Sequence, residues 1–189
     1  MNSPLKLLNI KQLLDSKYDF FIPAYQRGYR WRAEQVKLLI EDIQLYLEEN
    51  SARPEDMCPF YCLQAIVVKE NQGRLEVIDG QQRLTTILII LQAYYVYYNF
   101  DFLKLQLQCG INNKPEIDLC LYSVKYETRK ESSSWLKNIT NAFLKDDNRK
   151  ELQDLKNKNS DYYHFVEAFE TAFEIFDGFG IDSAQKSIR

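Results

Sequence analysis

Histidine is almost absent from this sequence, with His164 the single one in 189 residues. The cysteines are few as well (Cys58, Cys62, Cys109 and Cys120), and they form no Cys-x-x-Cys pair. If Cys58 and Cys62 share one extended segment, their Cα atoms lie about 13 Å apart, too far for a disulfide or a shared metal ion. We therefore expect no protein-ligated metal and no disulfide framework, and reduced thiols indicate a cytoplasmic protein.

Glycine and proline are also scarce, with six and five residues, so helices should dominate the fold. No segment has the pattern of a secretion signal or of a membrane span. The main apolar run follows Leu84, but it begins beside Arg83, contains Gln92 and is rich in tyrosine, which favours a buried helix. The net charge of −3 argues against broad electrostatic wrapping of nucleic acid and leaves a local basic patch open.

The segment from Val77 to Thr86 organises the rest of the sequence. An apolar run before Asp79 is typical of a buried strand, Asp79-Gly80 is a turn signal, and a helix is expected from Gln81 to about Tyr98. The polar side chains at this junction are those of Asp79, Gln81, Gln82, Arg83 and Thr85. A helix start offers unpaired N–H groups and an arginine adds a planar cation, so the junction favours phosphate. The alternative is a capped helix, with Asp79 bonded to the first turn and Arg83 in solvent.

A second unusual segment runs from Ile22 to Arg32. Its eleven residues contain three arginines, three large aromatic residues and no acid: Arg27, Arg30 and Arg32 with Tyr25, Tyr29 and Trp31. Aromatic rings beside guanidinium groups can stack on a base and bind phosphate. The alternative is that the rings pack on the core and the arginines cover them.

Patterns elsewhere predict a helix-rich chain with one hairpin. We expect helices at Asn9–Ser16, Ala33–Asn50, after Ser132–Ser134 and at Asp161–Phe176, extended segments at Phe20–Ile22, Phe60–Lys69 and Arg74–Ile78, and a turn at Asn71–Gly73. After a loop at Asn112–Pro115, Ile117–Tyr122 is predicted to be a strand or a helix start. Asp146–Ser160 lacks an apolar stripe and is predicted to be an exposed loop or a fraying helix. Gln64 interrupts its strand with a buried amide, for which the Gln81-Gln82 turn is the expected partner. His164 is interpreted as a packing or surface residue.

Two motifs resemble a known family: IPAYQRGYRW (Ile22–Trp31) and VIDGQQRLTT (Val77–Thr86), joined by FYCLQAIVV. Together with YETRKESSSWLKNI and DYYHFVEAFETAF, they are similar to the N-terminal domain of GmrSD-type restriction proteins, a ParB/sulfiredoxin-like module of bacterial phage defence. The resemblance implies an α+β fold, in which a small ParB-like mixed sheet with packed helices is followed by a mainly helical part. We expect residues 1–100 to form the ParB-like domain and residues 101–189 the helical extension.

In that family the DGQQR motif is implicated in binding and hydrolysing nucleoside triphosphates. The resemblance therefore implies a nucleotide-binding, NTP-hydrolysing sensor that controls DNA cleavage in modification-dependent restriction. Family members continue into a His-Asn-His nuclease domain, which one histidine cannot supply. We expect either a fragment of a longer protein, favoured by the polar end, or a lone sensor subunit whose partner cuts DNA. The expected partners are nucleotide, DNA and that nuclease part, and homo-oligomer formation is left open.

The combined hypothesis assigns roles to single residues. Triphosphate oxygens contact the helix start, Arg83 and Arg27, with Gly80 and Thr85 at the same turn, and Tyr25 or Tyr29 stacks on the base. Gln26, Gln81 and Gln82 orient phosphate or water. Asp79 binds Mg²⁺ through water or polarises the nucleophile. Gln64 replaces a small residue of the family and alters one pocket wall. On this hypothesis Arg83→Ala abolishes nucleotide binding and leaves the melting temperature nearly unchanged.

Two alternatives belong to other classes of protein. In the first, the chain is a DNA-binding module without nucleotide turnover, in which Arg27, Arg30 and Arg32 contact phosphates. In the second, it is a structural interaction subunit and the motifs only hold a scaffold together. Sulfinic-acid reductase chemistry is set aside because no cysteine adjoins Asp79–Arg83.

Overall fold

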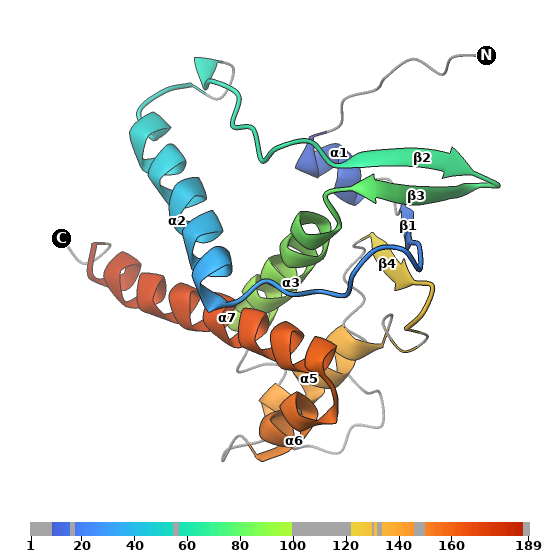
Figure 1. The fold of residues 1–189 in the computed structure, drawn as a ribbon. Coiled ribbons are helices and arrows are strands. Elements are labelled where there is room, and N and C mark those ends of the chain that lie inside the picture. The colour runs from blue at the N-terminus through green and yellow to red at the C-terminus, as the bar shows by residue number, and fades with distance from the viewer. Residues whose placement is uncertain are drawn as a thin grey trace.

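The computed structural model of the protein describes residues 9–15, 18–54, 57–99, 122–129, 131, 134–145 and 150–186. Its four-stranded sheet has the order β2-β3-β1-β4, built from β1 (Asp19–Ile22), β2 (Val67–Asn71), β3 (Arg74–Asp79) and β4 (Ser123–Tyr126). β1 is parallel to both β3 and β4, whereas β2 pairs with β3 in the antiparallel direction (Figure 1). The fold is α+β with a mixed sheet, as the sequence predicts.

The described helices are α1 (Ile10–Asp15), α2 (Ala33–Asn50), α3 (Gln81–Tyr98), α5 (Trp135–Lys145), α6 (Lys150–Lys158) and α7 (Ser160–Lys186). The long α7 packs against α2, α3, α5 and α6, and crosses between α2 and the α5–α6 pair (Figure 1). Its buried residues Phe165, Val166, Phe169 and Ala172 follow helical spacing and share one core with the sheet. The two predicted domains thus contribute to a common core, and their division at residue 100 stays a prediction. None of the described helices is both long and apolar enough to cross a membrane.

Local sequence signals are confirmed at several elements. α2 and α3 have the predicted bounds, and the hairpin turn falls at Gln72 and Gly73, with φ of 53° and 77°. Positive φ at both central residues suits a two-residue hairpin turn. The short α1, the extended segment at β1 and the α5 and α7 helices are confirmed as well, although α7 continues past Phe176 to Lys186.

Two predictions about elements need correction. The predicted strand Phe60–Lys69 begins only at Val67, because Gln64 has a φ of 65° that no extended strand allows. Of the loop or fraying helix predicted at Asp146–Ser160, the helix is present as α6, but it is not without an apolar stripe, since Leu152 and Leu155 are buried. The Asn112–Pro115 prediction, and that for Ile117–Tyr122 except its last residue, lie outside the described residues.

Gly80 alone connects β3 to α3 and determines how the helix starts. It has a φ of 86°, and a Cβ atom there would lie 3.0 Å from the Cα of Ile66. The left-handed conformation and the close backbone both require glycine. The segment at Ala65–Ile66 is therefore fixed against the start of α3.

We predict that Gly80→Ala lowers the free energy of unfolding by about 2–4 kcal/mol, because left-handed strain adds to the clash with the Ile66 backbone. Gly73→Ala is the matched control, since Gly73 is also left-handed but nothing lies within 4 Å of its added Cβ. It should lose only about 1–2 kcal/mol. Urea denaturation of both variants measures the difference, and equal losses would contradict the close approach.

Candidate functional site

The side chains of Gln81 and Gln82 hold the Pro23–Trp31 loop against the start of α3. Gln81 Nε2 donates to the carbonyl of Arg27 at 2.6 Å, and Gln82 Nε2 donates to that of Gly28 at 2.9 Å. Gln82 Oε1 accepts from the backbone N–H of Arg30 at 2.8 Å. Among the described residues, Gln81 Oε1 is the one amide atom of this pair without a hydrogen bond. The two predicted motifs are thus joined, and their glutamines position a loop.

Arg83 serves as a second connector in the same turn. Its guanidinium donates to Gln64 Oε1 at 2.8 Å and to the carbonyl of Ala65 at 2.9 Å, and it lies 3.8 Å from the Asp79 carboxylate. The predicted pairing of a buried Gln64 with Gln81 and Gln82 is wrong, because Gln64 is exposed and Arg83 is its partner. Arg83 thus bonds two protein acceptors, while its Nε is buried without a hydrogen bond to any described residue.

Two predicted ligand contacts lie in the core instead. Tyr29 is fully buried, shares a hydrogen bond with Thr86 at 2.9 Å and stacks on Phe165 with ring centroids 5.3 Å apart. Thr85 is fully buried as well and shares a hydrogen bond with the Tyr126 hydroxyl. Burial raises the pKa of Tyr126 to about 12, so this hydroxyl stays protonated. In this conformation neither Tyr29 nor Thr85 has surface with which to contact a ligand.

Arg30 belongs to a partly buried ion cluster rather than to an open cationic surface. Its Nη1 lies 2.5 Å from Oδ1 of Asp161, whose other oxygen accepts from Nε of Arg129. Gly28 packs on this cluster, and an added Cβ would lie 2.7 Å from Nη2 of Arg129. The cluster fixes the loop to the first turn of α7, and Arg30 shares the single negative charge of Asp161 with Arg129.

The exposed polar groups at the junction are Tyr25, Arg27 and Asp79. Tyr25 is 68% exposed, and no described residue forms a hydrogen bond or an ion pair with the Arg27 guanidinium. Gln26 donates to the carbonyl of Ile78 at 2.8 Å, which places both neighbours of Gln26 beside the β3–α3 junction. No side chain caps α3, contrary to the Asp79 cap that was the alternative.

Electrostatically this junction suits an anion better than a metal ion. The first turn of α3 has no side-chain cap and carries the positive end of the helix dipole, and the exposed Arg27, which has no partner for its guanidinium among the described residues, adds a positive charge. Asp79 is the one acid among the exposed groups named above. In the part of the chain that the structure describes, no three His, Cys, Asp or Glu side chains gather as metal ligands.

His164 lies on α7 near the Arg30 cluster. Its Nδ1 is 3.8 Å from Oε2 of Glu167, and both atoms are buried without a hydrogen bond to any described residue. Burial lowers the pKa of His164, and the nearby Arg30 charge lowers it further. A neutral imidazole packed in this way fits the predicted packing role.

Comparison with protein families gives one match. Residues 10–186 match the model of the "GmrSD restriction endonuclease, N-terminal domain". No curated protein and no solved structure matches the chain.

We predict that Asp161→Asn lowers the free energy of unfolding by about 1–3 kcal/mol, because two guanidinium groups lose their shared counter-charge in a partly buried site. Glu41→Gln is the matched control, since Glu41 forms an exposed pair with Lys37 at 3.6 Å. It should change stability by less than about 0.5 kcal/mol. Chemical denaturation distinguishes the two, and similar small losses would show that the cluster is not stabilising.

We also predict that Arg83→Ala lowers the free energy of unfolding by about 1–2 kcal/mol, since Gln64 and Ala65 lose their donor. This replaces the expectation of an unchanged melting temperature. Arg53→Ala removes an exposed arginine from the loop after α2 and should have little effect. If both variants have the same melting temperature in a thermal denaturation, Arg83 does not fix the segment at residues 64 and 65.

Proposed function

Because the chain belongs to the GmrSD restriction endonuclease family as its N-terminal domain, we propose that it is a nucleotide-binding regulatory domain. In this proposal a nucleoside triphosphate occupies the β3–α3 junction and licenses DNA cleavage by a nuclease part outside residues 1–189. Hydrolysis of the nucleotide is the finer part of the proposal. The single histidine provides no His-Asn-His motif within these residues.

The observation that carries the proposal is the exposed Arg27, whose backbone is bonded to the start of α3 and whose guanidinium has no hydrogen bond or ion pair with a described residue. Arg30 is bonded to Asp161 and Arg83 to the segment at Gln64–Ala65, so each already has protein partners. The backbone carbonyl of Arg27 is bonded to Gln81, the first residue of α3. A phosphate there gains the charge of the guanidinium and the N–H groups of the first turn.

The remaining exposed groups supply the other parts of such a site. Tyr25 is the exposed aromatic ring of the loop and stacks on the base in place of the buried Tyr29. Magnesium bound to nucleotides is commonly held by phosphate oxygens, waters and one or two carboxylates. The exposed Asp79 can supply one such carboxylate. Such an ion would neutralise phosphate charge. Gln81 and Gln82 act as positioning residues, because they bond the loop backbone at Arg27, Gly28 and Arg30.

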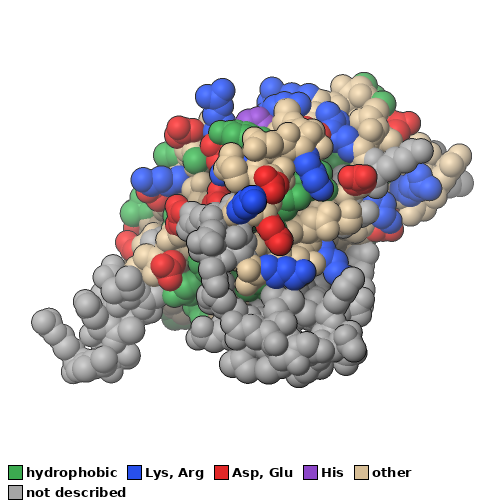
Figure 2. Space-filling model, turned by 90° about the horizontal axis from the view of Figure 1, so that it is seen from below, with side chains coloured by type: hydrophobic (Ala, Val, Ile, Leu, Met, Phe, Trp, Pro, Cys, Tyr) green, Lys and Arg blue, Asp and Glu red, His purple; other side chains and the backbone are tan. Residues whose placement is uncertain are grey.

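Direct DNA binding through the arginine-rich loop is less well supported. Only Arg27 and Arg32 of its three arginines are exposed, because Arg30 is committed to Asp161. On the face shown in Figure 2, basic and acidic side chains are interspersed, and neither sign forms a continuous field. DNA contact therefore belongs to the larger restriction system in this proposal.

We predict that one of ATP, GTP, CTP or UTP raises the melting temperature in the presence of Mg²⁺, since a ligand stabilises the state that binds it. Arg27→Ala should weaken that binding by roughly tenfold or more, the loss expected for one charge-assisted contact to phosphate. Tyr25→Ala should weaken it for every phosphate analogue that carries a base and leave binding of inorganic triphosphate unchanged. Thermal-shift and calorimetric titrations measure both effects.

Arg53→Ala is the control for loss of a positive charge and should bind nucleotide like the parent chain. A nucleotide that binds equally to the parent and to Arg27→Ala places the site elsewhere. Absence of any shift with all four nucleotides, combined with salt-dependent binding of DNA that Arg27→Ala weakens, would support the DNA-binding alternative instead.

A further inference from the structure

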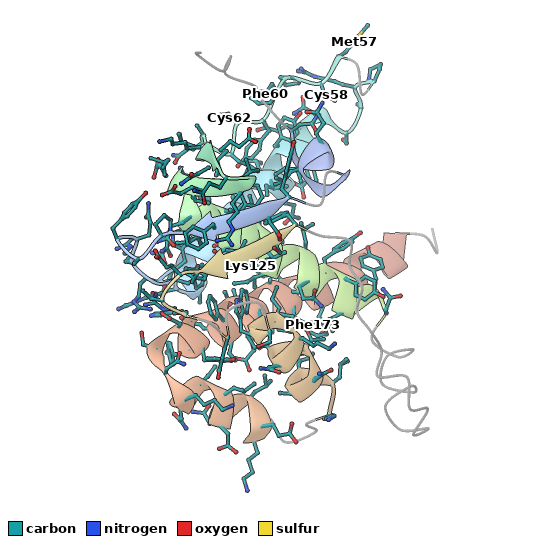
Figure 3. All side chains as sticks on the ribbon, turned by 90° about the vertical axis from the view of Figure 1, so that its right-hand side faces the viewer. Met57, Cys58, Phe60, Cys62, Lys125 and Phe173 are labelled. Atoms are coloured by element: carbon teal, nitrogen blue, oxygen red, sulfur yellow. The ribbon has the colours of Figure 1, made fainter. Side chains whose placement is uncertain are left out.

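An apolar strip lies on the surface between α2 and β2. Residues 57–68 contain no charged side chain. Apart from two cysteines and Tyr61, their one polar side chain is that of Gln64. Phe60 is 83% exposed and Met57 is 69% exposed. Figure 3 shows Met57, Cys58, Phe60 and Cys62 together at one end of the molecule, with Met57 at the outer tip. Contiguous exposed apolar surface of this kind marks an interaction site.

Part of the strip is held in place against α2. The Tyr46 hydroxyl donates to the carbonyl of Pro59, and the rings of Tyr46 and Tyr61 lie 5.2 Å apart. Phe60 is thus exposed although both of its neighbours contact α2. Partial burial and the nearby Asp42 carboxylate raise the pKa of Tyr61, which agrees with a position of Tyr61 over the acidic side of the helix.

The outward side of α2, the helix that contacts the strip through Tyr46, also exposes apolar side chains. Leu38 and Leu45 are 58% and 55% exposed, and their spacing of seven residues places them on the same side of the helix, about 10.5 Å apart. The acids that flank them are exposed: Glu34, Glu41, Asp42 and Glu49. We call Leu38, Asp42, Leu45 and Glu49, together with Phe60 and Tyr61, the outer surface of α2.

We propose that the outer surface of α2 binds a basic amphipathic helix of a partner protein. Leucines two helical turns apart match the i, i+7 spacing of apolar residues on such a helix, and its lysines or arginines would face the acids. A second copy of this chain fits less well, because a symmetric contact through the same surface would bring like charges together. The proposal is independent of the nucleotide site, since none of these six residues lies in the 22–32 or 77–86 segments.

A labelled helical peptide of about 18 residues, built from leucine and lysine with leucines on one face, is the probe. We expect the full chain to bind it in fluorescence anisotropy. Leu45→Ser and Phe60→Ser should each weaken binding by roughly tenfold, as for apolar residues at the centre of an interface. The double variant Asp42→Lys with Glu49→Lys should no longer bind the leucine–lysine peptide. It should instead bind a leucine–glutamate peptide of the same pattern.

Matched controls separate this surface from general stickiness. Tyr163→Ser removes an exposed ring of α7, and Asp177→Lys reverses an exposed charge there; both should bind like the parent chain. A peptide of the same composition with scrambled leucines should bind at least roughly tenfold more weakly. Equal binding of the scrambled peptide, no binding of any peptide, or binding that the surface variants leave unchanged would overturn the proposal. So would a dimer in sedimentation that Leu45→Ser dissociates, because a second copy would then cover the surface.

Discussion

The hydrogen bonds from the amides of Gln81 and Gln82 to the Pro23–Trp31 loop are the interaction on which the rest depends. This loop has no strand neighbour, so side chains satisfy the backbone groups of Arg27, Gly28 and Arg30 that a sheet would otherwise satisfy. Each such bond contributes only about 1 kcal/mol net, but a buried carbonyl left without a donor costs about 1–3 kcal/mol. Three bonds from two adjacent residues therefore fix the loop in one conformation.

A fixed loop also organises the core. With Gly28 and Arg30 fixed, Tyr29 is directed inward, where its ring stacks on Phe165 and its hydroxyl meets Thr86. Phe165 in turn stacks on Trp135, with ring centroids 3.8 Å apart, so α5 and α7 are aligned with α3 through one aromatic column. This packing needs residues from both halves of the sequence. It explains why the Ile22–Arg32 segment is rich in aromatic residues although much of its role is structural.

The elements that the sequence predicted well are those determined by residues close together along the chain. The bounds of α2 and α3 and the hairpin turn follow from periodicity and turn chemistry, which are local. The predicted strand at Phe60–Lys69 is shorter because the backbone at Gln64 turns, with its side chain bonded to Arg83. The sequence left a loop or a fraying helix open at α6, because its two buried leucines form a stripe only once α7 covers them. Nothing local distinguishes the buried Tyr29 from the exposed Tyr25, and Asp161 lies 131 residues beyond Arg30.

The division of the arginines explains how a narrow anion site can arise within a cationic segment. A guanidinium that is already bonded to a carboxylate or to carbonyls has fewer N–H donors left for phosphate, and the protein supplies such partners to Arg30 and Arg83. Among the described residues, Arg27 has a bond to its backbone carbonyl and none to its exposed guanidinium. Selectivity for one phosphate position then follows from which charges the fold has already neutralised, and not from the number of arginines in the motif.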